Sequence, residues 1–325
     1  MKKKLFILFL IALFAFSGCK KENEISNEFQ ISNSSAITYI SENELTKAKG
    51  FASELAVVPA NSPNSPASEQ VHAECALLVN STTGEVIFNK NAHTRAYPAS
   101  TTKCLTAMLA MKYGDINSSR TVGNEVIITE DNVVMCDYRV GDNVPFDVAL
   151  HGSIMKSGND AASVLALFGS DTLTGFADLM NKEVYSIGAT NSHFVNPHGL
   201  MDYDHYSTAY DMYLIFREAV KNDYFIDVIS KKTYSGSLQR TTVYGSYVIP
   251  CNYASTNPFF GGVTTAPEHV KVIGGKSGYT EVARRSYVLL AEANGQQYIC
   301  VVMKDDNLDY LFADLVYLLN MIPKE

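Results

Sequence analysis

Short runs of strand-forming residues lie towards both ends of the sequence, and a block with helical periodicity separates them. Near the start, runs at 76–80 and 85–89 flank a Ser-Thr-Thr-Gly turn, which predicts a β-hairpin. Three more strands are expected near the end, at 270–274, 286–292 and 298–303. Strands at both ends of one chain predict an α+β fold, in which an antiparallel sheet is flanked by helices.

Apolar residues recur at three- and four-residue spacing through the middle of the chain, as in helices that pack on a core. In the first of these helices, expected at 99–113, Leu105, Met108 and Leu109 share one face. The other helices are expected at 145–155, 160–168, 175–187, 208–222 and 310–319. A chain of 325 residues with 46% hydrophobic residues can bury a substantial core.

The N-terminus has the features of an export signal. Three lysines at 2–4 precede an uncharged apolar run at 5–16, which is too short to cross a bilayer as a helix. The following Phe-Ser-Gly-Cys resembles a bacterial lipobox, so 1–19 is expected to be a lipoprotein signal peptide with Cys19 acylated. The alternatives are an ordinary cleaved signal, or an uncleaved anchor in which Cys19 is incidental. All of them predict export.

A polar segment rich in Ser, Asn and Glu follows at 20–70 and ends in a proline-containing stretch. This composition predicts a flexible tether that holds the folded part away from a membrane. The folded catalytic domain is expected at 71–325.

The charge and the cysteines exclude several classes of protein. The net charge is −8, and no basic stripe follows the first few residues, so nucleic-acid binding is not expected. The five cysteines after Cys19 form no C-x-x-C pair, which argues against zinc-ribbon and thioredoxin-like folds. Two disulfides are the most that could form, and buried free thiols are an equal alternative.

Three short motifs contain residue types suited to acyl transfer. In the Ser-Thr-Thr-Lys sequence at 100–103, helical spacing lets the Lys103 amine reach the Ser100 hydroxyl. Such an amine can act as the base once burial and nearby cations lower its pKa. A Ser-Gly-Asn sequence at 157–159 lies between two expected helices, where glycine permits a tight bend. A Lys-Ser-Gly sequence at 276–278 follows an expected strand and could lie beside a bound peptide.

Each motif alone has an ordinary structural explanation: a capped helix, a turn between helices or a turn between strands. Together, in this order and on an exported chain, they match the set shared by penicillin-binding proteins and class A β-lactamases. Longer blocks resemble the low-molecular-mass penicillin-binding D-alanyl-D-alanine carboxypeptidases, at 97–103, 156–162, 196–200, 205–211 and 276–280. The similarity runs from about residue 73 to the end of the chain.

The resemblance implies the penicillin-recognising serine transferase fold, with the site between an antiparallel sheet and a helical subdomain. It implies that Ser100 attacks the penultimate D-Ala of a peptidoglycan stem pentapeptide and forms an acyl-enzyme, while Lys103 accepts its proton. Ser157 would relay a proton to the leaving D-Ala with Lys276 nearby. Asn159 would bond the substrate backbone and hold Lys103. β-Lactam antibiotics would be covalent inhibitors.

The resemblance also implies where the substrate is held. The backbone amides of Ser100 and Tyr279 are expected to form the oxyanion hole. The expected substrate-binding residues are Ser277, Gly278 and Thr280, to which we add Arg284 as our own hypothesis.

Two positions depart from the family pattern. Ser277 replaces the usual Thr and keeps its hydroxyl. Leu311 stands where the family has an Arg that helps to bind the terminal carboxylate. We hypothesise that Arg284, or its neighbour Arg285, supplies the missing cation.

Two other kinds of catalysis are not supported. His198 and His205, with Asp202 and Asp204 between them, suggest a metal site, but no zinc-peptidase helix motif is present, so no metal and no cofactor are expected. A class A β-lactamase needs a Glu that activates the deacylating water, and the E-x-x-L-N segment is missing around Glu183.

The alternatives from another functional class are a β-lactam-binding sensor and a non-catalytic wall-binding scaffold. Sensors of this fold are usually fused to membrane helices, which are missing here, whereas all the expected catalytic side chains are present. The C-terminal β-domain and amphipathic anchor common in the family are also missing. We therefore expect a lipid on Cys19 to attach the exported protein to the outer side of the bacterial cytoplasmic membrane or in the periplasm.

Overall fold

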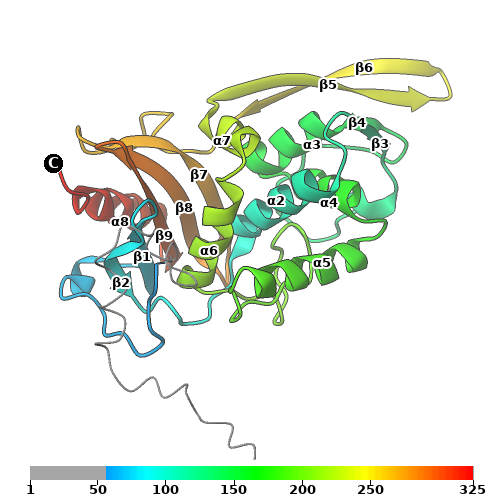
Figure 1. The fold of residues 1–325 in the computed structure, drawn as a ribbon. Coiled ribbons are helices and arrows are strands. Elements are labelled where there is room, and N and C mark those ends of the chain that lie inside the picture. Colours follow the sequence, from blue (N-terminus) through cyan, green and yellow to red (C-terminus); the bar gives the residue numbers. More distant parts are fainter. Residues whose placement is uncertain (1–55, 325) are drawn as a thin grey trace, which may run out of the picture. The chain divides into compact units, whose positions relative to one another are not determined.

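The computed structural model describes residues 56–324 of the chain (Figure 1). The expected signal peptide, its Cys19 and most of the expected tether lie outside the described residues. Within 56–324, no helix combines the length and the apolar character needed to cross a membrane.

The main sheet is antiparallel, has five strands and follows the order β2-β1-β9-β8-β7 (Figure 1). Strand β1 pairs with β9, so the first and last strands of the described part are neighbours. This arrangement confirms the expectation of one antiparallel sheet built from both ends of the domain. The strands are β1 (Cys75–Asn80), β2 (Glu85–Lys90), β7 (Lys271–Thr280), β8 (Arg284–Ala293) and β9 (Gln296–Asp305).

Side chains alternate along these strands between two apolar layers. On β8, Leu289 belongs to the layer that contains Leu315 of helix α8 (Leu308–Asn320). The next residue, Leu290, belongs to the opposite layer, which contains Phe216 of helix α6 (Ala209–Ala219). The sheet is therefore buried on both faces, which explains why its central strands are continuous apolar runs.

The helical region packs against the second face of the sheet. Helix α2 (Lys103–Tyr113) contacts α4, α5 and α6 and is buried almost all round, as expected for a central helix. A short 3₁₀ turn, η3 (Ala99–Thr102), precedes it and contacts β7. The other helical elements are α3 (Phe146–His151), the π-helical turn η5 (Gly152–Lys156), α4 (Asn159–Gly169), α5 (Leu173–Ser186), α6 (Ala209–Ala219) and α7 (Asp223–Ser230), with short 3₁₀ turns at Ser68–Gln70 and Asn124–Val126.

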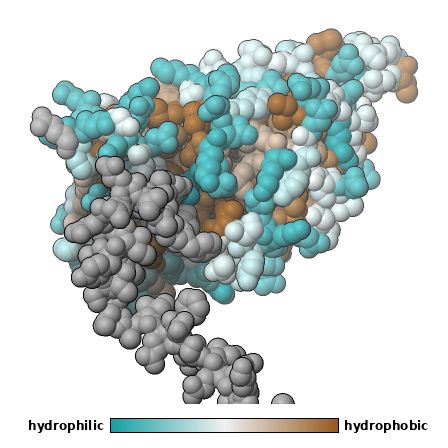
Figure 2. All heavy atoms as spheres, in the orientation of Figure 1, coloured by the Kyte–Doolittle hydropathy of each residue, from teal (hydrophilic) through white to brown (hydrophobic). Residues whose placement is uncertain are grey.

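A second sheet, with the order β3-β4-β5-β6, is not predicted from the sequence. Its strands β5 and β6 form a long hairpin that extends past the helices, with hydrophobic side chains visible at its far end (Figures 1 and 2). Most hairpin residues are exposed, and the apolar residues of β6, such as the exposed Tyr247 and Val248, do not alternate with polar ones as in a half-buried strand. The strands are β3 (Ser119–Thr121), β4 (Asn143–Pro145), β5 (Thr233–Thr242) and β6 (Gly245–Ala254).

One expected helix is shorter than predicted, and a further helix that was not predicted follows it. The predicted helix at 208–222 ends at Ala219, and Asn222 caps the separate helix α7 by accepting a hydrogen bond from Tyr224 N–H. Asn is favoured at this capping position, so a helix boundary at residue 222 has a local physical cause.

Residues 56–70 differ from the expected tether. Ala56 is fully buried, and the carbonyl of Val58 is bonded to His93 Nε2. The backbone N–H of Ser65 donates to the carbonyl of Asn89 on the edge strand β2. Covering a sheet edge satisfies polar groups that would otherwise be exposed, and a polar segment can do this without an apolar signature. The folded part therefore extends N-terminally of residue 71.

Candidate active site

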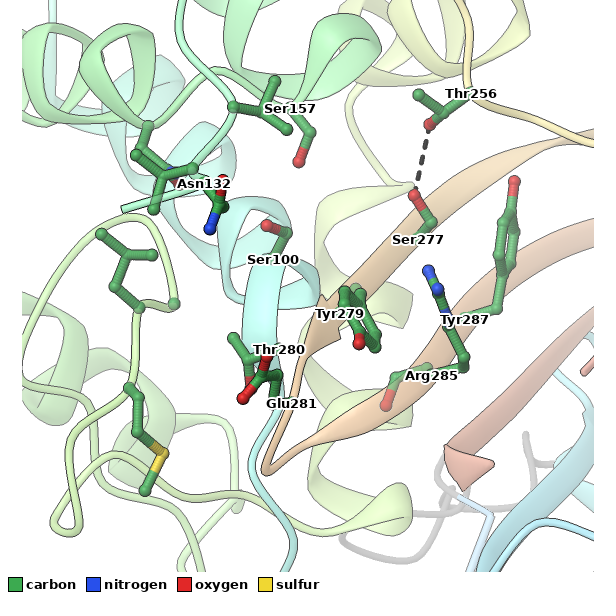
Figure 3. A pocket seen from close by; sticks show the side chains of 18 of the residues that line it. Ser100, Asn132, Ser157, Thr256, Ser277, Tyr279, Thr280, Glu281, Arg285 and Tyr287 are labelled. Atoms are coloured by element: carbon green, nitrogen blue, oxygen red, sulfur yellow. Dashed lines mark hydrogen bonds between the residues drawn. The ribbon is translucent and has the colours of Figure 1, made fainter. Parts of the chain in front are cut away.

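A pocket of about 700 Å³ is lined by residues of all three motifs (Figure 3). Ser100 comes from the start of the helical region, Ser157 from the bend before α4, and Asn159 is the first residue of α4. The wall opposite is the end of β7, and 3₁₀ turn η3 contacts this strand directly. The lining residues from β7 and the turn after it are Ser277, Gly278, Tyr279, Thr280 and Glu281.

The position of Ser100 depends on the residue before it. Ala99 has a φ of 48°, in the left-handed region. Its carbonyl oxygen lies so close to Gly199 that a Cβ there would be only 1.8 Å away. Gly199 also has a φ of +82°, so glycine is needed both for the backbone conformation and for the contact. The loop at 196–200 therefore braces the turn that carries Ser100.

Lys103 Nζ is bonded to three oxygen atoms: Ser100 Oγ at 2.9 Å, Asn159 Oδ1 at 2.8 Å and the carbonyl of His198 at 2.7 Å. No carboxylate is among these partners, and the lysine is fully buried. Burial, and then the charge of Lys276, hold the pKa of Lys103 well below its usual value. A neutral amine has two N–H donors for the two carbonyl oxygens, which leaves its lone pair for the Ser100 hydroxyl.

Lys276 Nζ donates to Ser157 Oγ and to the carbonyl of Ser277, both at 2.9 Å. It is also fully buried, and burial lowers its pKa to about 8. The bend beside it differs from the expectation. Ser157, with a φ of 65°, takes the left-handed conformation, and Gly158 does not. Gly158 instead permits close packing, because a Cβ there would lie 2.4 Å from Cys136 Sγ.

The end of β7 forms one wall of the pocket. The Ser277 hydroxyl shares a hydrogen bond of 3.2 Å with Thr256 Oγ1 (Figure 3). At Gly278, a Cβ would lie 2.8 Å from the carbonyl of Pro98, so this glycine lets β7 approach η3. Tyr279 is half-exposed beside Ser100.

The two candidate arginines lie in different surroundings. Arg284 is the first residue of β8 and has a φ of 57°; it forms an ion pair with Asp306 and does not line the pocket. Arg285 does line the pocket, and its guanidinium carbon lies 3.6 Å from the centre of the Tyr279 ring. The structure therefore does not bring Arg284 to the site, and it places Arg285 there. Leu311 also lines the pocket, as an apolar wall.

Thr256 and Asn132 line the pocket but were not predicted as site residues. Thr256 follows strand β6, and Asn132 belongs to an irregular stretch between η4 (Asn124–Val126) and β4. Neither segment carries a motif or a periodic pattern, so only the tertiary arrangement identifies them.

His198 and His205, the two histidines considered as metal ligands, have structural roles. His205 Nδ1 accepts from the N–H of Val195, so in the neutral ring Nε2 carries the proton and donates to Thr102 Oγ1. Burial lowers the pKa of His198 and of His205 to about 3, which keeps both neutral. Across residues 56–324, no group of three or more His, Cys, Asp or Glu side chains could hold a metal ion.

Glu183 and the cysteines within residues 56–324 do not line the pocket. Glu183 binds Lys112 Nζ at 2.7 Å. The five cysteines of the described part are all free thiols.

Comparison with curated proteins identifies related sequences over the same part of the chain. D-alanyl-D-alanine carboxypeptidase DacF of Bacillus subtilis is 31% identical over 240 residues, which are 72% of this chain and 58% of that protein. D-alanyl-D-alanine carboxypeptidase DacA of Escherichia coli is 33% identical over 186 residues, which are 54% of this chain and 46% of that protein. The chain thus spans about half the length of these two relatives.

Solved structures show the same fold. The Streptomyces K15 DD-transpeptidase has a TM-score of 0.70 at 26% identity, and the match covers 77% of this chain and 97% of that structure. A penicillin-binding protein homologue from Mycobacterium tuberculosis has a TM-score of 0.65 at 26% identity, covering 81% and 94% respectively. A family model described as D-alanyl-D-alanine carboxypeptidase matches residues 60–307, which include all three motifs. The chain therefore belongs to the D-alanyl-D-alanine carboxypeptidase family and has the penicillin-recognising serine transferase fold.

Proposed function

We propose that the protein is a serine D,D-carboxypeptidase that removes the terminal D-Ala from peptidoglycan stem pentapeptides. The observation that carries this proposal is the buried Lys103 amine, which touches the Ser100 hydroxyl and has no carboxylate partner among the described residues. A nucleophile in contact with a base of lowered pKa is the arrangement that acyl transfer needs. Family membership supports the choice of substrate.

Acylation begins when Ser100 Oγ attacks the carbonyl carbon of the penultimate D-Ala. Its proton passes to the lone pair of Lys103, which the carbonyl groups of Asn159 and His198 aim at the hydroxyl. The backbone N–H groups of Ser100 and Tyr279 stabilise the oxyanion of the tetrahedral intermediate. Removal of one such donor from another serine hydrolase costs about 3 kcal/mol.

The intermediate collapses when the C–N bond to the terminal D-Ala breaks. The leaving amine takes a proton from Ser157, whose hydroxyl is bonded to the Lys276 ammonium. Ser157 regains a proton from the Lys103 ammonium, which returns Lys103 to its neutral form. D-Ala departs, and the acyl group stays on Ser100 as an ester. Water then attacks this ester and gives a proton to Lys103. Lys103 returns that proton to Ser100 Oγ as the ester bond breaks and the tetrapeptide is released.

β-Lactams would acylate Ser100 in the same way, but the opened ring keeps the leaving group in place. The carboxylate of Glu183 is bound to Lys112 and is not available to activate a deacylating water. We therefore expect the acyl-enzyme formed with penicillin to be hydrolysed slowly.

The N-terminal sequence is the basis for the proposed cellular location. The basic and apolar N-terminus and the lipobox-like sequence support export and a lipid on Cys19. A lipid anchor would hold the domain on the outer side of the bacterial cytoplasmic membrane, where stem peptides are found.

Release of D-Ala tests the proposal. The purified protein, incubated with an N-acylated peptide ending in Lys-D-Ala-D-Ala, is expected to release one D-Ala per peptide, and Ser100→Ala is expected to release none. A protein that binds penicillin but releases no D-Ala would be a sensor or a scaffold, and this result would contradict the proposed activity.

A further inference from the structure

We propose that Arg285 binds the terminal carboxylate of the substrate, with Tyr279 as its positioning residue, and this inference rests on the proposed function. A substrate that ends in D-Ala-D-Ala brings a negative charge into the pocket. A cation without an acidic partner is needed to compensate for the lost hydration of that charge.

The pocket offers few cations for this task. Among the described residues that line it, the cationic side chains are Lys156 and Arg285. Lys156 lies 3.9 Å from the carboxylate of Asp137. Arg285 has no acidic partner within residues 56–324. The Arg285 guanidinium is therefore the pocket cation that a substrate carboxylate can bind without displacing a carboxylate of the protein.

The register of the β7–β8 hairpin directs Arg285 to the pocket. Ser277 lies opposite Tyr287, and Tyr279 lies opposite Arg285. Residues two apart on a strand share a face, so all four side chains lie on one face of the hairpin. Figure 3 shows Arg285 between Tyr279 and Tyr287, with its guanidinium directed towards Ser277.

The Tyr279 ring holds the guanidinium in place. Its centre lies 3.6 Å from the guanidinium carbon, within the range of a cation–π contact. Stacking uses the flat face of the guanidinium and leaves its N–H edge free, and two parallel hydrogen bonds to a carboxylate need this edge. The Ser277 hydroxyl stands at the same end of the pocket.

Helix α8 supplies no alternative cation. Its sequence contains no Lys or Arg, and the residues that it contributes to the pocket are Leu308, Leu311 and Phe312. Recognition of the carboxylate is thus assigned to strand β8, opposite an apolar wall from α8.

The test compares Arg285→Ala with the matched control Arg284→Ala, which alters the adjacent arginine outside the pocket. Each variant is assayed with a peptide ending in D-Ala-D-Ala and with the same peptide ending in D-Ala-D-alaninamide. We expect Arg285→Ala to lower kcat/KM for the acid about 100-fold, as for a lost partner of a buried charge. Arg285→Ala should change kcat/KM for the amide by less than about threefold. Arg284→Ala should change kcat/KM for either peptide by less than about threefold.

Tyr279 is tested by separating its ring from its hydroxyl. Tyr279→Phe keeps the stacking face and should leave KM for the acid unchanged, whereas Tyr279→Leu should raise it several-fold with little change in kcat. The inference is wrong if Arg285→Ala behaves as Arg284→Ala does, or if it loses the acid and the amide activities equally. Absence of D-Ala release by the unmodified protein would instead refute the proposed function.

Discussion

Lys276 Nζ donates a hydrogen bond to Ser157 Oγ over 2.9 Å, which joins strand β7 to the bend before helix α4. The cation is buried, and its pKa falls to about 8. Its charge also helps to lower the pKa of Lys103. Lys103, whose pKa is lowered by burial and by the charge of Lys276, is therefore the lysine better suited to accept a proton, and Lys276 is the one better suited to remain a cation. Such a pair can remove one proton and support the delivery of another.

The two lysines predict a bell-shaped dependence of kcat/KM on pH. Activity should rise with pH as the Lys103 amine loses its proton, because the base acts in its neutral form. It should fall above about pH 8 as Lys276 loses its charge. Initial rates of D-Ala release between pH 5 and pH 10 measure both limbs. Activity that keeps rising to pH 10 would show that Lys276 is not needed as a cation.

Asn159→Ala is expected to lower both activity and stability. It removes the oxygen that accepts from Lys103 Nζ at 2.8 Å, so the amine loses its orientation and a buried donor loses its partner. The cost in unfolding free energy should be about 1–3 kcal/mol, measured by urea denaturation.

Ser163→Ala, on the same helix, is the matched control for Asn159→Ala. The Ser163 hydroxyl is buried and has no hydrogen-bond partner in the described part of the chain. Its removal should leave stability unchanged or raise it, with activity intact. Equal losses in the two variants would mean that the bond from Lys103 to Asn159 has no special role.

Gly199→Ala should displace the turn that carries Ser100. The new Cβ would stand 1.8 Å from the carbonyl oxygen of Ala99, at a φ of +82°. Backbone strain and overpacking together predict a loss of about 2–4 kcal/mol in stability, accompanied by a loss of activity. Gly261→Ala is the control, since its nearest contact would be 3.8 Å away, and its change should stay within about 0.5 kcal/mol.

Asp305 predicts a stability that depends on pH. Its buried carboxyl lies near Asp314, which accepts hydrogen bonds from the N–H groups of His72 and Ala73. Burial, and then the Asp314 charge, raise the pKa of Asp305 to about 7, above its ordinary 3.8. The folded protein therefore holds this proton more tightly than the unfolded chain, and stability is lost as the pH rises through 7.

Asp305→Asn should remove much of that pH dependence. Thermal unfolding at pH 5.5 and at pH 8.5 measures it, and the fall in Tm between these values should be smaller in the variant. An unchanged difference in Tm would assign the pH dependence to other groups.

The sequence predicts some parts of the site because their geometry is local. Ser100 and Lys103 are three residues apart at the start of a helix, so their contact follows from helical spacing. Lys276 and Ser157 are 119 residues apart, so only the family resemblance predicts their contact from the sequence.

Other features depend on tertiary structure and could not be predicted. The choice between Arg284 and Arg285 depends on the hairpin register, which is set where Arg284 takes a left-handed conformation. The hairpin of β5 and β6 is mostly exposed, and residues 56–70 cover the edge of β2 with polar contacts. Neither shows the alternation of apolar and polar residues from which a half-buried strand could be predicted.

Incubation of the purified protein with benzylpenicillin, followed by mass spectrometry of the intact chain and its peptides, tests Ser100 as the nucleophile most directly. We expect one covalent adduct per chain, located on the peptide that contains Ser100 and absent from Ser100→Ala. A chain that stays unmodified, or an adduct on any other residue, would contradict the assignment of Ser100.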